Sequence, residues 1–354
     1  MKMIITRTPF RVTLGGGGTD LPSFYQKHGG FILAVSIDKY MYLNVNTPIV
    51  DDAIRLKYSI NEFVQYVDDV KHDLAREAMK LFRIDTGLEV VSLADIPAGT
   101  GLGSSSCYLV GLLKALHALS QDPVSTHQLA EEACQIELEV LNKPIGKQDQ
   151  YMAAFGGLTQ MRIAPDGTVD ITRHALPFEI LEELESNMLM FYTGEVRNAQ
   201  QILKKQDDAT KKNEGDVVSS LLEIKDMGIE ICDCITRGNL SRFGELMDQH
   251  WQMKKRLAKE ISNPRIDRWY ELAKENGAIG GKITGAGGGG FLTLYCEGSK
   301  TALRNAMYKA GLRELNFRFD FEGSKVIFDV VTRDGRLAHM KRLESNGNAA
   351  LIEA

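Results

Sequence analysis

Alternating glycines followed by three serines, in Pro97-Ala-Gly-Thr-Gly-Leu-Gly-Ser-Ser-Ser106, have the composition of an anion-binding loop. Glycines at alternate positions let backbone N–H groups converge without interference from Cβ atoms, and a helix that follows points its positive end at the enclosed ligand. The serine hydroxyls can bond phosphate oxygens or ligate a hard cation such as Mg²⁺. The pattern alone also suits a tight strand-to-helix turn with a serine N-cap, so both interpretations stay open.

Two more glycine clusters, Gly15 to Gly18 and seven glycines between Gly280 and Gly290, directly adjoin strand-like segments and are interpreted as shaped loops. No G-x-x-x-x-G-K-[ST] motif occurs in the chain. The run from Gly285 to Gly290 matches G-x-G-x-x-G, but the strand pattern of Phe291–Cys296 follows it where a dinucleotide-binding loop requires a helix. An oxidoreductase built on this run is therefore excluded.

The segments between these clusters have the patterns of the elements that must position them. β-branched and aromatic residues predict strands, and apolar residues at helical spacing predict helices. The expected strands span 40–45, 88–93, 157–163, 188–192, 278–284, 291–296 and 325–331. The expected helices span 106–119, 125–141, 217–272 with breaks at 238–239 and 263–264, and 299–312. The last pieces resemble a split β-α-β unit.

Composition and charge exclude several classes of protein. The 354 residues carry a net charge of −5 and are 44% hydrophobic, which is ordinary for a globular chain and unsuited to binding nucleic acid or an anionic membrane. No apolar run approaches the roughly 18 residues of a membrane span, so a cytoplasmic protein is expected. Five cysteines are too few, and an odd number, for a disulfide framework. The sequence leaves the oligomeric state open, a homodimer included.

Three ordered motifs resemble those of the GHMP kinases, the family of galactokinase, homoserine kinase, mevalonate kinase and phosphomevalonate kinase. The segment Pro97–Ser106 is similar to the family's nucleotide-phosphate loop, Thr8–Asp20 resembles its first motif, and Lys282–Gly290 resembles its third. Three motifs in the family's order are far more specific than any one of them. The resemblance implies phosphoryl transfer that depends on ATP and Mg²⁺.

The resemblance, with the order of the elements, implies an α+β chain with the two-domain GHMP kinase fold. Residues 1–182 would form a mixed α/β nucleotide-binding domain, and residues 183–331 a ferredoxin-like domain with a split β-α-β unit. The tail 332–354 has no predicted role. The ATP phosphates would bind the loop residues Pro97, Gly99, Gly101, Leu102, Gly103, Ser104, Ser105 and Ser106.

The resemblance also implies the residues of metal binding and catalysis. Ser105 or Ser106 would ligate Mg²⁺ together with Glu137, for which Glu139 is the alternative. Asp149 would accept the proton of the acceptor hydroxyl or orient that hydroxyl, with Lys147 and Arg11 beside it. Without the family context, Asp149 suits a loop position just as well, and either glutamate suits a solvated helix face.

Differences between this chain and the family pattern in the first motif indicate which acceptor sugar to expect. Galactokinases carry a Glu-His pair directly before Thr-Asp, where this chain has Gly17-Gly18, so galactose is disfavoured. The first motif, Ile37–Tyr40 and Ile145–Tyr151 together resemble the branch of the family that acts on heptose 7-phosphates. That branch transfers the γ-phosphate of ATP to the anomeric hydroxyl, giving a 1,7-bisphosphate for nucleotide-heptose synthesis.

The substrate-binding residues implied are Gly17, Gly18, Thr19, Asp20, Lys39, Arg197, Gly287 and Gly288. The glycine run would leave room for a longer sugar and offer N–H groups to an anion, and Lys39 and Arg197 are the candidates for pairing with the distal phosphate. Another sugar such as fucose is an alternative acceptor. A non-catalytic sensor of sugar and nucleotide is an alternative function.

Overall fold

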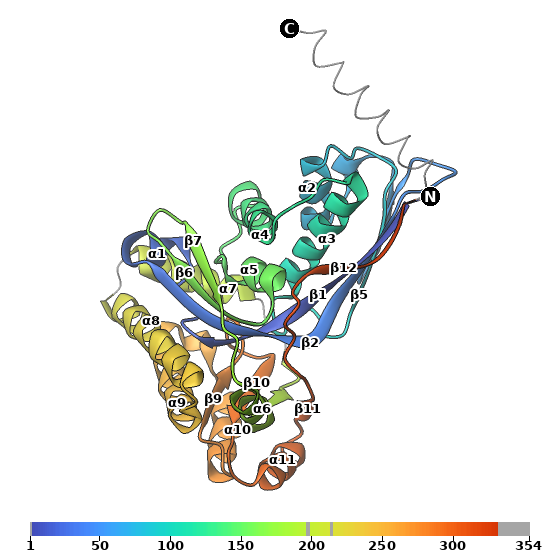
Figure 1. Ribbon diagram of the computed structural model, residues 1–354. Helices are drawn as coiled ribbons and strands as arrows, with labels where there is room; N and C mark the ends of the chain where they lie inside the picture. Colours follow the sequence, from blue (N-terminus) through green and yellow to red (C-terminus); the bar gives the residue numbers. More distant parts are fainter. Residues whose placement is uncertain (1, 196–198, 213–214, 332–354) are drawn as a thin grey trace.

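The computed structural model describes residues 2–195, 199–212 and 215–331, and two β-sheets organise this part of the chain (Figure 1). The larger sheet has the strand order β12-β1-β2-β5-β3-β4, with β6 paired to β2 and β7 paired to β6. Its strands are β1 (Lys2–Gly15), β2 (Gly30–Asn46), β3 (Ile54–Lys57), β4 (Asn61–Val64), β5 (Glu89–Ala94), β6 (Leu158–Ile163), β7 (Val169–Arg173) and β12 (Lys325–Val331). The C-terminal half of β1 and the N-terminal half of β2 are buried because other elements pack against both of their faces.

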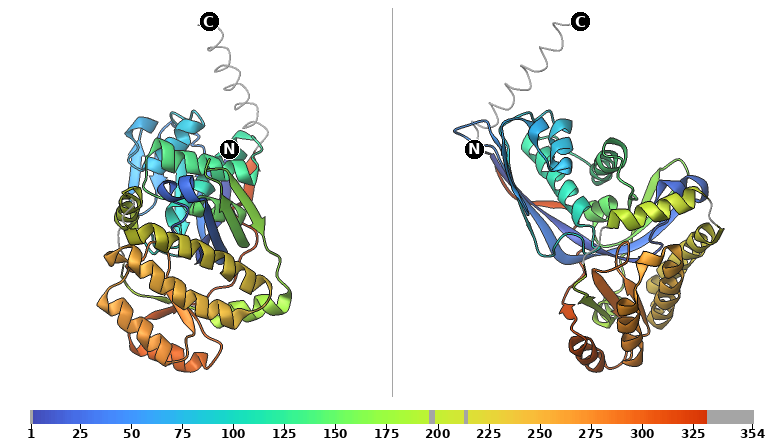
Figure 2. Two further views of the ribbon diagram at one scale, coloured as in Figure 1. Left: turned by 90° about the vertical axis from the view of Figure 1, so that its left-hand side faces the viewer. Right: turned by 180° about the vertical axis from the view of Figure 1, so that it is seen from behind.

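Helices cover one face of β1 and β2, and the smaller sheet with its own helices lies beyond the other face (Figure 2). The first group comprises α2 (Asp73–Leu81), α3 (Ser104–Ser120), α4 (Thr126–Cys134) and α5 (Gln148–Phe155). The short helices α1 (Pro22–His28), α6 (Phe178–Asn187) and α7 (Ala199–Lys211) complete the N-terminal half and the connection to the second half. None of the helices in the described ranges is long and apolar enough to cross a membrane.

The smaller sheet confirms the ferredoxin-like arrangement. Its order is β11-β8-β10-β9, with every neighbouring pair antiparallel. The strands are β8 (Met188–Tyr192), β9 (Gly280–Ile283), β10 (Phe291–Tyr295) and β11 (Arg313–Leu315), and the helices are α8 (Gly215–Thr236), α9 (Leu240–Leu257), α10 (Pro264–Glu275) and α11 (Lys300–Lys309). The helix ends at 236, 240, 257 and 264 confirm the two predicted breaks in the helical region.

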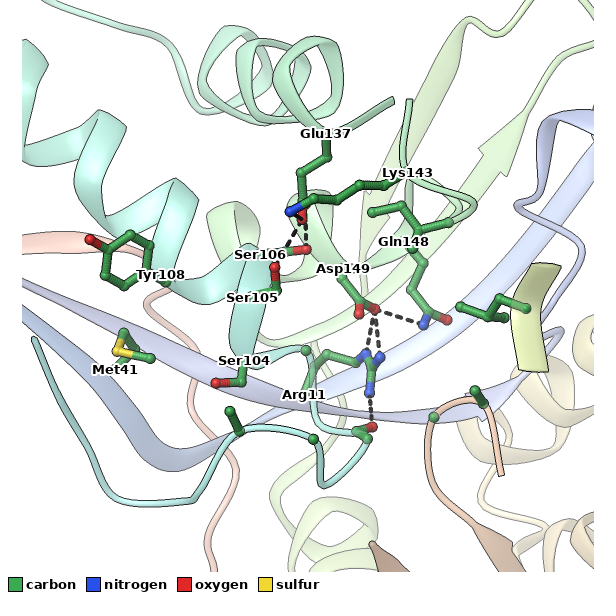
Figure 3. Close-up of a pocket in the computed structure, with 18 of the residues that line it drawn as sticks. Arg11, Met41, Ser104, Ser105, Ser106, Tyr108, Glu137, Lys143, Gln148 and Asp149 are labelled. Atoms are coloured by element: carbon green, nitrogen blue, oxygen red, sulfur yellow. Dashed lines mark hydrogen bonds and ion pairs between the residues drawn. The ribbon is translucent and has the colours of Figure 1, made fainter. Parts of the chain in front are cut away.

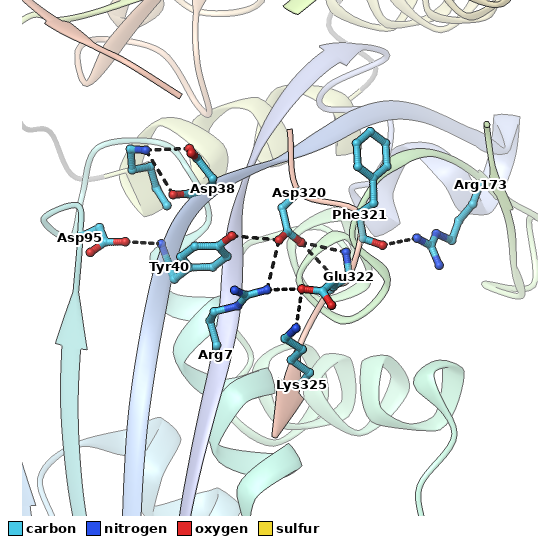
Figure 4. Close-up of polar contacts among 11 residues, drawn as sticks. Arg7, Asp38, Tyr40, Asp95, Arg173, Asp320, Phe321, Glu322 and Lys325 are labelled. Atoms are coloured by element: carbon cyan, nitrogen blue, oxygen red, sulfur yellow. Dashed lines mark hydrogen bonds and ion pairs between the residues drawn. The ribbon is translucent and has the colours of Figure 1, made fainter. Parts of the chain in front are cut away.

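The last strand returns to the larger sheet, so β12 does not belong with the C-terminal elements among which the sequence placed it. It pairs antiparallel with β1, whose outer edge would otherwise have unpaired backbone groups. Side chains hold the returning segment, because Arg7 donates to Asp320 and Glu322, and Tyr40 donates to Asp320 (Figure 4). The boundary near residue 182 stays a prediction.

A change of helix type follows α4. The predicted helix 125–141 is α-helical only to Cys134 and continues as a π-helix over Gln135–Val140. The extra residue in a π-turn rotates the side chains that follow it relative to an α-helix. Within this segment Glu137 is buried and Glu139 is exposed.

Candidate active site

A cavity of about 830 Å³ lies between the two halves of the chain and receives residues from both. The phosphate loop and the first turn of α3 form its middle. Met41 and Tyr108 lie on one side of Ser104, and Asp149 and Gln148 lie on the other (Figure 3). The cavity therefore has an apolar and aromatic end, which suits a nucleobase, and a polar end, which suits a sugar.

The phosphate loop has the backbone of an anion site. Gly99, Gly101 and Gly103 have φ of 79°, 82° and 84°, in the left-handed region that favours glycine. Gly103 is the N-cap of α3 and supplies no side-chain hydrogen bond, so the three serines occupy the first turn. This excludes the serine N-cap and leaves the first-turn N–H groups and the positive end of the helix directed at the cavity.

The third motif packs directly against the phosphate loop. A Cβ atom on Gly101 would lie 2.6 Å from the carbonyl oxygen of Thr284, so only glycine permits this approach. Gly285 and Ala286 line the cavity. The predicted substrate residues Gly287 and Gly288 do not.

Gly287 and Gly288 instead pack on the segment before α10. The Gly288 N–H donates to the carbonyl of Ile261 at 2.8 Å, and a Cβ atom on Gly287 would meet the same residue at 2.9 Å. These two glycines therefore support the loop without facing the substrate. Leu102 likewise belongs to the core, being 1% exposed, although its carbonyl accepts a hydrogen bond from the Arg11 N–H.

Arg11 and Asp149 form an ion pair beneath the phosphate loop. The Oδ1 atom of Asp149 accepts hydrogen bonds from Arg11 Nε at 2.8 Å and Nη2 at 2.6 Å, and from Gln148 Nε2 at 2.8 Å. Arg11 Nη1 donates to the carbonyl of Gly101 at 2.6 Å, which ties the pair to the loop. No hydrogen bond within the described ranges engages Oδ2, and the Asp149 side chain is 28% exposed to the cavity.

Lys147 does not approach Asp149, contrary to the expectation from sequence. Its Nζ donates to both carboxylate oxygens of Glu131, at 3.1 and 3.3 Å, and to the carbonyl of Gly167 at 3.0 Å. Lys147 is the N-cap of α5 and Asp149 lies in the first turn, so the two side chains leave the helix in different directions. Arg11 is therefore the cation beside Asp149.

Glu137 has the surroundings of a ligand for a hard cation. Ser105 Oγ donates to its Oε1 at 3.0 Å, Ser106 Oγ to its Oε2 at 2.8 Å, and Gln150 Nε2 to Oε2 at 2.6 Å. Burial, at 1% exposure, raises the pKa of Glu137, while these hydrogen bonds oppose the rise. A carboxylate with two hydroxyl oxygens beside a phosphate loop fits Mg²⁺, which takes one or two carboxylates together with phosphate oxygens. Glu139 is exposed and takes no part.

The first motif contributes part of its predicted set. Gly17, Gly18 and Asp20 line the polar end. Asp20 is 7% exposed, accepts a hydrogen bond from the Gln148 N–H at 3.1 Å, and has a pKa raised chiefly by burial. Thr19 is fully buried, and its hydroxyl bonds backbone carbonyls, so it holds the loop and does not face the cavity.

Of the two predicted partners for a distal phosphate, Lys39 can be placed, and it does not face the cavity. The Lys39 Nζ lies 2.6 Å from Asp38 Oδ1, and Lys39 does not line the cavity. Arg197 lies outside the described residues. Lys39 is therefore unsuited to bind a phosphate in this cavity, and the role of Arg197 stays a prediction.

Two lysines that sequence reasoning missed do line the polar end. Lys254 on α9 is 7% exposed and Lys282 on β9 is 2% exposed. Burial, with repulsion from Arg11, lowers the pKa of Lys254 to about 8, and burial also lowers the pKa of Lys282. The signal for Lys254 was available, because it lies one helical turn after the buried His250 and so on the buried face of α9.

Comparison with known proteins matches two family models. Residues 66–157 match the GHMP kinases N terminal domain, and residues 232–312 match the GHMP kinases C terminal domain. The D-glycero-alpha-D-manno-heptose 7-phosphate kinase of Campylobacter jejuni is 30% identical over 340 residues, covering 92% of this chain and 98% of that protein.

Two further comparisons bear on fold and acceptor. The L-fucokinase/L-fucose-1-P guanylyltransferase of Bacteroides fragilis is 26% identical, covering 86% of this chain and 35% of that protein. A solved structure titled D-glycero-D-manno-heptose 1-phosphate kinase, from Bacteroides thetaiotaomicron, superimposes with a TM-score of 0.76 at 22% identity. It covers 93% of this chain and 100% of that chain, which establishes the shared fold.

Proposed function

Because the chain belongs to the GHMP kinase family and is an ATP-dependent sugar kinase, we propose that its acceptor is D-glycero-D-manno-heptose 7-phosphate. The γ-phosphoryl group of ATP would go to the anomeric hydroxyl, giving the 1,7-bisphosphate. The similarity to the Campylobacter heptose kinase over nearly the whole chain supports this acceptor. Gly17 and Gly18 line the acceptor end without side chains, which leaves room for a long phosphorylated sugar.

The free Oδ2 atom of Asp149 is the observation that carries the proposed chemistry. Arg11 and Gln148 occupy Oδ1 and fix the plane of the carboxylate, so Oδ2 is available to take the proton of the acceptor hydroxyl. The N–H groups of the phosphate loop and α3 position the phosphates and stabilise the charge that develops. When bound, ATP with Mg²⁺ supplies the phosphoryl group, and Glu137 with the Ser105 and Ser106 hydroxyls would hold the cation.

ADP release, coupled to an indicator reaction, tests the acceptor on a panel of heptose 7-phosphate, heptose, fucose and galactose. We expect the highest kcat/KM for heptose 7-phosphate, with phosphorus NMR placing the new phosphate at the anomeric position. A preference for fucose would instead favour the function suggested by the fucokinase relative. ATP binding without turnover of any sugar would favour a sensor. Assembly as a homodimer, a cytoplasmic location and the absence of nucleic-acid and membrane partners stay predictions.

A further inference from the structure

The ammonium groups of Lys254 and Lys282 are buried but use few of their hydrogen-bond donors. Each ammonium carries three N–H donors. Lys254 donates to the carbonyl of Gly285, and Lys282 donates to the carbonyl of Leu14 at 2.7 Å. No carboxylate in the described ranges lies within ion-pair distance of either lysine. Both side chains therefore have donors available to a ligand in the cavity that they line.

The charged groups at this end of the cavity do not balance. Arg11 and the two lysines would carry three positive charges when both lysines are protonated, against at most two negative charges from Asp149 and Asp20, and burial lowers the pKa of both lysines in the absence of a counter-charge. Asp149 is already paired with Arg11, and burial raises the pKa of Asp20. Burying an unpaired cation is unfavourable unless a ligand supplies the counter-charge. The imbalance therefore suits an anionic ligand.

Close packing between α9 and β9 brings the two lysines near enough to affect each other's charge. A Cβ atom on Gly280 would lie 2.0 Å from the carbonyl oxygen of Gly244, so the helix and the strand touch through their backbones. His250, one turn before Lys254, has both ring nitrogens buried without a hydrogen-bond partner. Burial lowers the pKa of His250, with repulsion from both lysines as a smaller cause, so it remains neutral and offers no counter-charge.

We propose that Lys254 and Lys282 bind the ester phosphate of the acceptor sugar and thereby select a phosphorylated over an unphosphorylated substrate. This inference rests on the proposed function and replaces Lys39 and Arg197 as the phosphate-binding pair. The carbonyl that accepts from Lys282 belongs to Leu14, which directly precedes the Gly15–Gly18 run. Lys282 therefore lies against the glycine-rich wall of the acceptor end, and Lys254 interacts electrostatically with Asp20 of the same motif.

The test compares two substrates in matched variants. Lys254→Met and Lys282→Met remove the charge and keep the length of the side chain, and replacing a buried charge with an apolar residue is often neutral for folding. Lys2→Met is the control, because Lys2 is 6% exposed and donates to the carbonyl of Leu119 at 3.1 Å, outside the cavity. We expect each cavity variant to lose at least tenfold in kcat/KM for heptose 7-phosphate and less than threefold for heptose. The control should keep both values.

An equal loss for both sugars would overturn the inference, because the lysines would then act on the transferred phosphoryl group or on the fold. A wild-type preference for heptose 7-phosphate that survives in both variants would also overturn it, while leaving the proposed function standing. A wild type that does not favour the phosphorylated sugar would instead overturn the proposed acceptor. These three results are distinct in the same set of rate measurements.

Calorimetry gives a readout that does not depend on turnover or on the variants' folding. An anion bound beside Lys254 favours its charged form, so binding of heptose 7-phosphate to the wild type near pH 8 should take up protons. The groups that face Lys254 are Arg11, Asp20, Lys282 and the neutral His250. Titrations in buffers of different ionisation enthalpy measure the uptake. Binding without proton uptake would contradict a phosphate beside this lysine.

Discussion

Replacing Asp149 with Asn should abolish most turnover while leaving ATP binding intact. Three donors converge on Oδ1, two from Arg11 and one from Gln148, at 2.6 to 2.8 Å. An amide oxygen can take the place of Oδ1 and keep these contacts, which sets the amide NH₂ in the place of Oδ2. A donor then stands where the acceptor hydroxyl needs a proton acceptor, so the variant keeps the shape of the site and loses its base.

The expected loss follows from the role of the carboxylate. Positioned general bases contribute about 10²- to 10⁴-fold in rate, which corresponds to about 2.7 to 5.5 kcal/mol in the activation free energy. The free energy of unfolding should fall by about 1 to 3 kcal/mol, because Arg11, whose side chain is 4% exposed, exchanges a charged partner for a neutral one. Coupled ADP release gives kcat, and nucleotide titration followed by calorimetry gives the dissociation constant for ATP.

Asp51→Asn is the matched control for Asp149→Asn, because Asp51 also pairs with an arginine, Arg55 at 2.5 Å, but lies outside the cavity. Its kcat should equal that of the wild type. A kcat within threefold of the wild type in Asp149→Asn would refute the assignment of the proton acceptor. A folded Asp149→Asn protein that no longer binds ATP would refute it too, since the carboxylate would then be organising the nucleotide site.

Three more predictions concern the metal ligand, the phosphate loop and the buried Lys254. Glu137→Gln should raise the Mg²⁺ concentration for half-maximal activity at least tenfold and should leave KM for the sugar nearly unchanged. The control Glu139→Gln should change neither quantity. Magnesium titrations of the activity measure both variants. Gly101→Ala should raise KM for ATP at least tenfold because its Cβ would clash with the third motif. Gly311→Ala, which shares a positive φ but meets nothing within 4 Å, should lose only stability, by about 1 kcal/mol in urea unfolding. Burial lowers the pKa of Lys254 to about 8 in the folded protein, from 10.5 in the unfolded chain. Unfolding therefore takes up a proton between these pH values, so the free energy of unfolding should rise from pH 8 to pH 10. Lys254→Met should reduce this rise.

The fold class was implied by the family resemblance, and local patterns were enough to predict the middle of the site. The spacing of Gly99, Gly101 and Gly103 before an apolar helix specifies a left-handed, Cβ-free loop at a helix N-terminus, and the structure has that loop. The helical breaks follow equally from turn residues, whereas the ferredoxin-like arrangement of the smaller sheet was implied by the family resemblance, and its strand β11 was not predicted. The loop and the helical breaks depend on neighbours within a few residues, which a single sequence contains.

Features that depend on tertiary direction could not be predicted in this way. Lys147 is two residues from Asp149 but pairs with Glu131, because a helix N-terminus sends neighbouring side chains to different sides. Helical spacing from the buried Ala133 and Cys134 already favours Glu137 over Glu139, but nothing in the composition of 125–141 marks where the α-helix gives way to a π-helix. The position of β12 depends on the outer edge of β1, which pairs with it, and a single sequence does not show which sheet edge is open.

The two buried lysines show how the acceptor end could distinguish a phosphorylated sugar from an unphosphorylated one, although Lys254 lies outside the three motifs. Lys254 and Lys282 come from a helix and a strand of the C-terminal half, and the packing of α9 on β9 brings them close enough to repel each other. Their mutual repulsion, with that of Arg11, opposes folding, and an anion between them would relieve it. A phosphorylated acceptor should therefore bind more tightly than its uncharged counterpart in the pH range where both lysines carry charge, and at equal concentration it should raise the free energy of unfolding more. The excess of positive charge that lowers the stability of the empty acceptor end would thus also favour an anionic acceptor over an uncharged one.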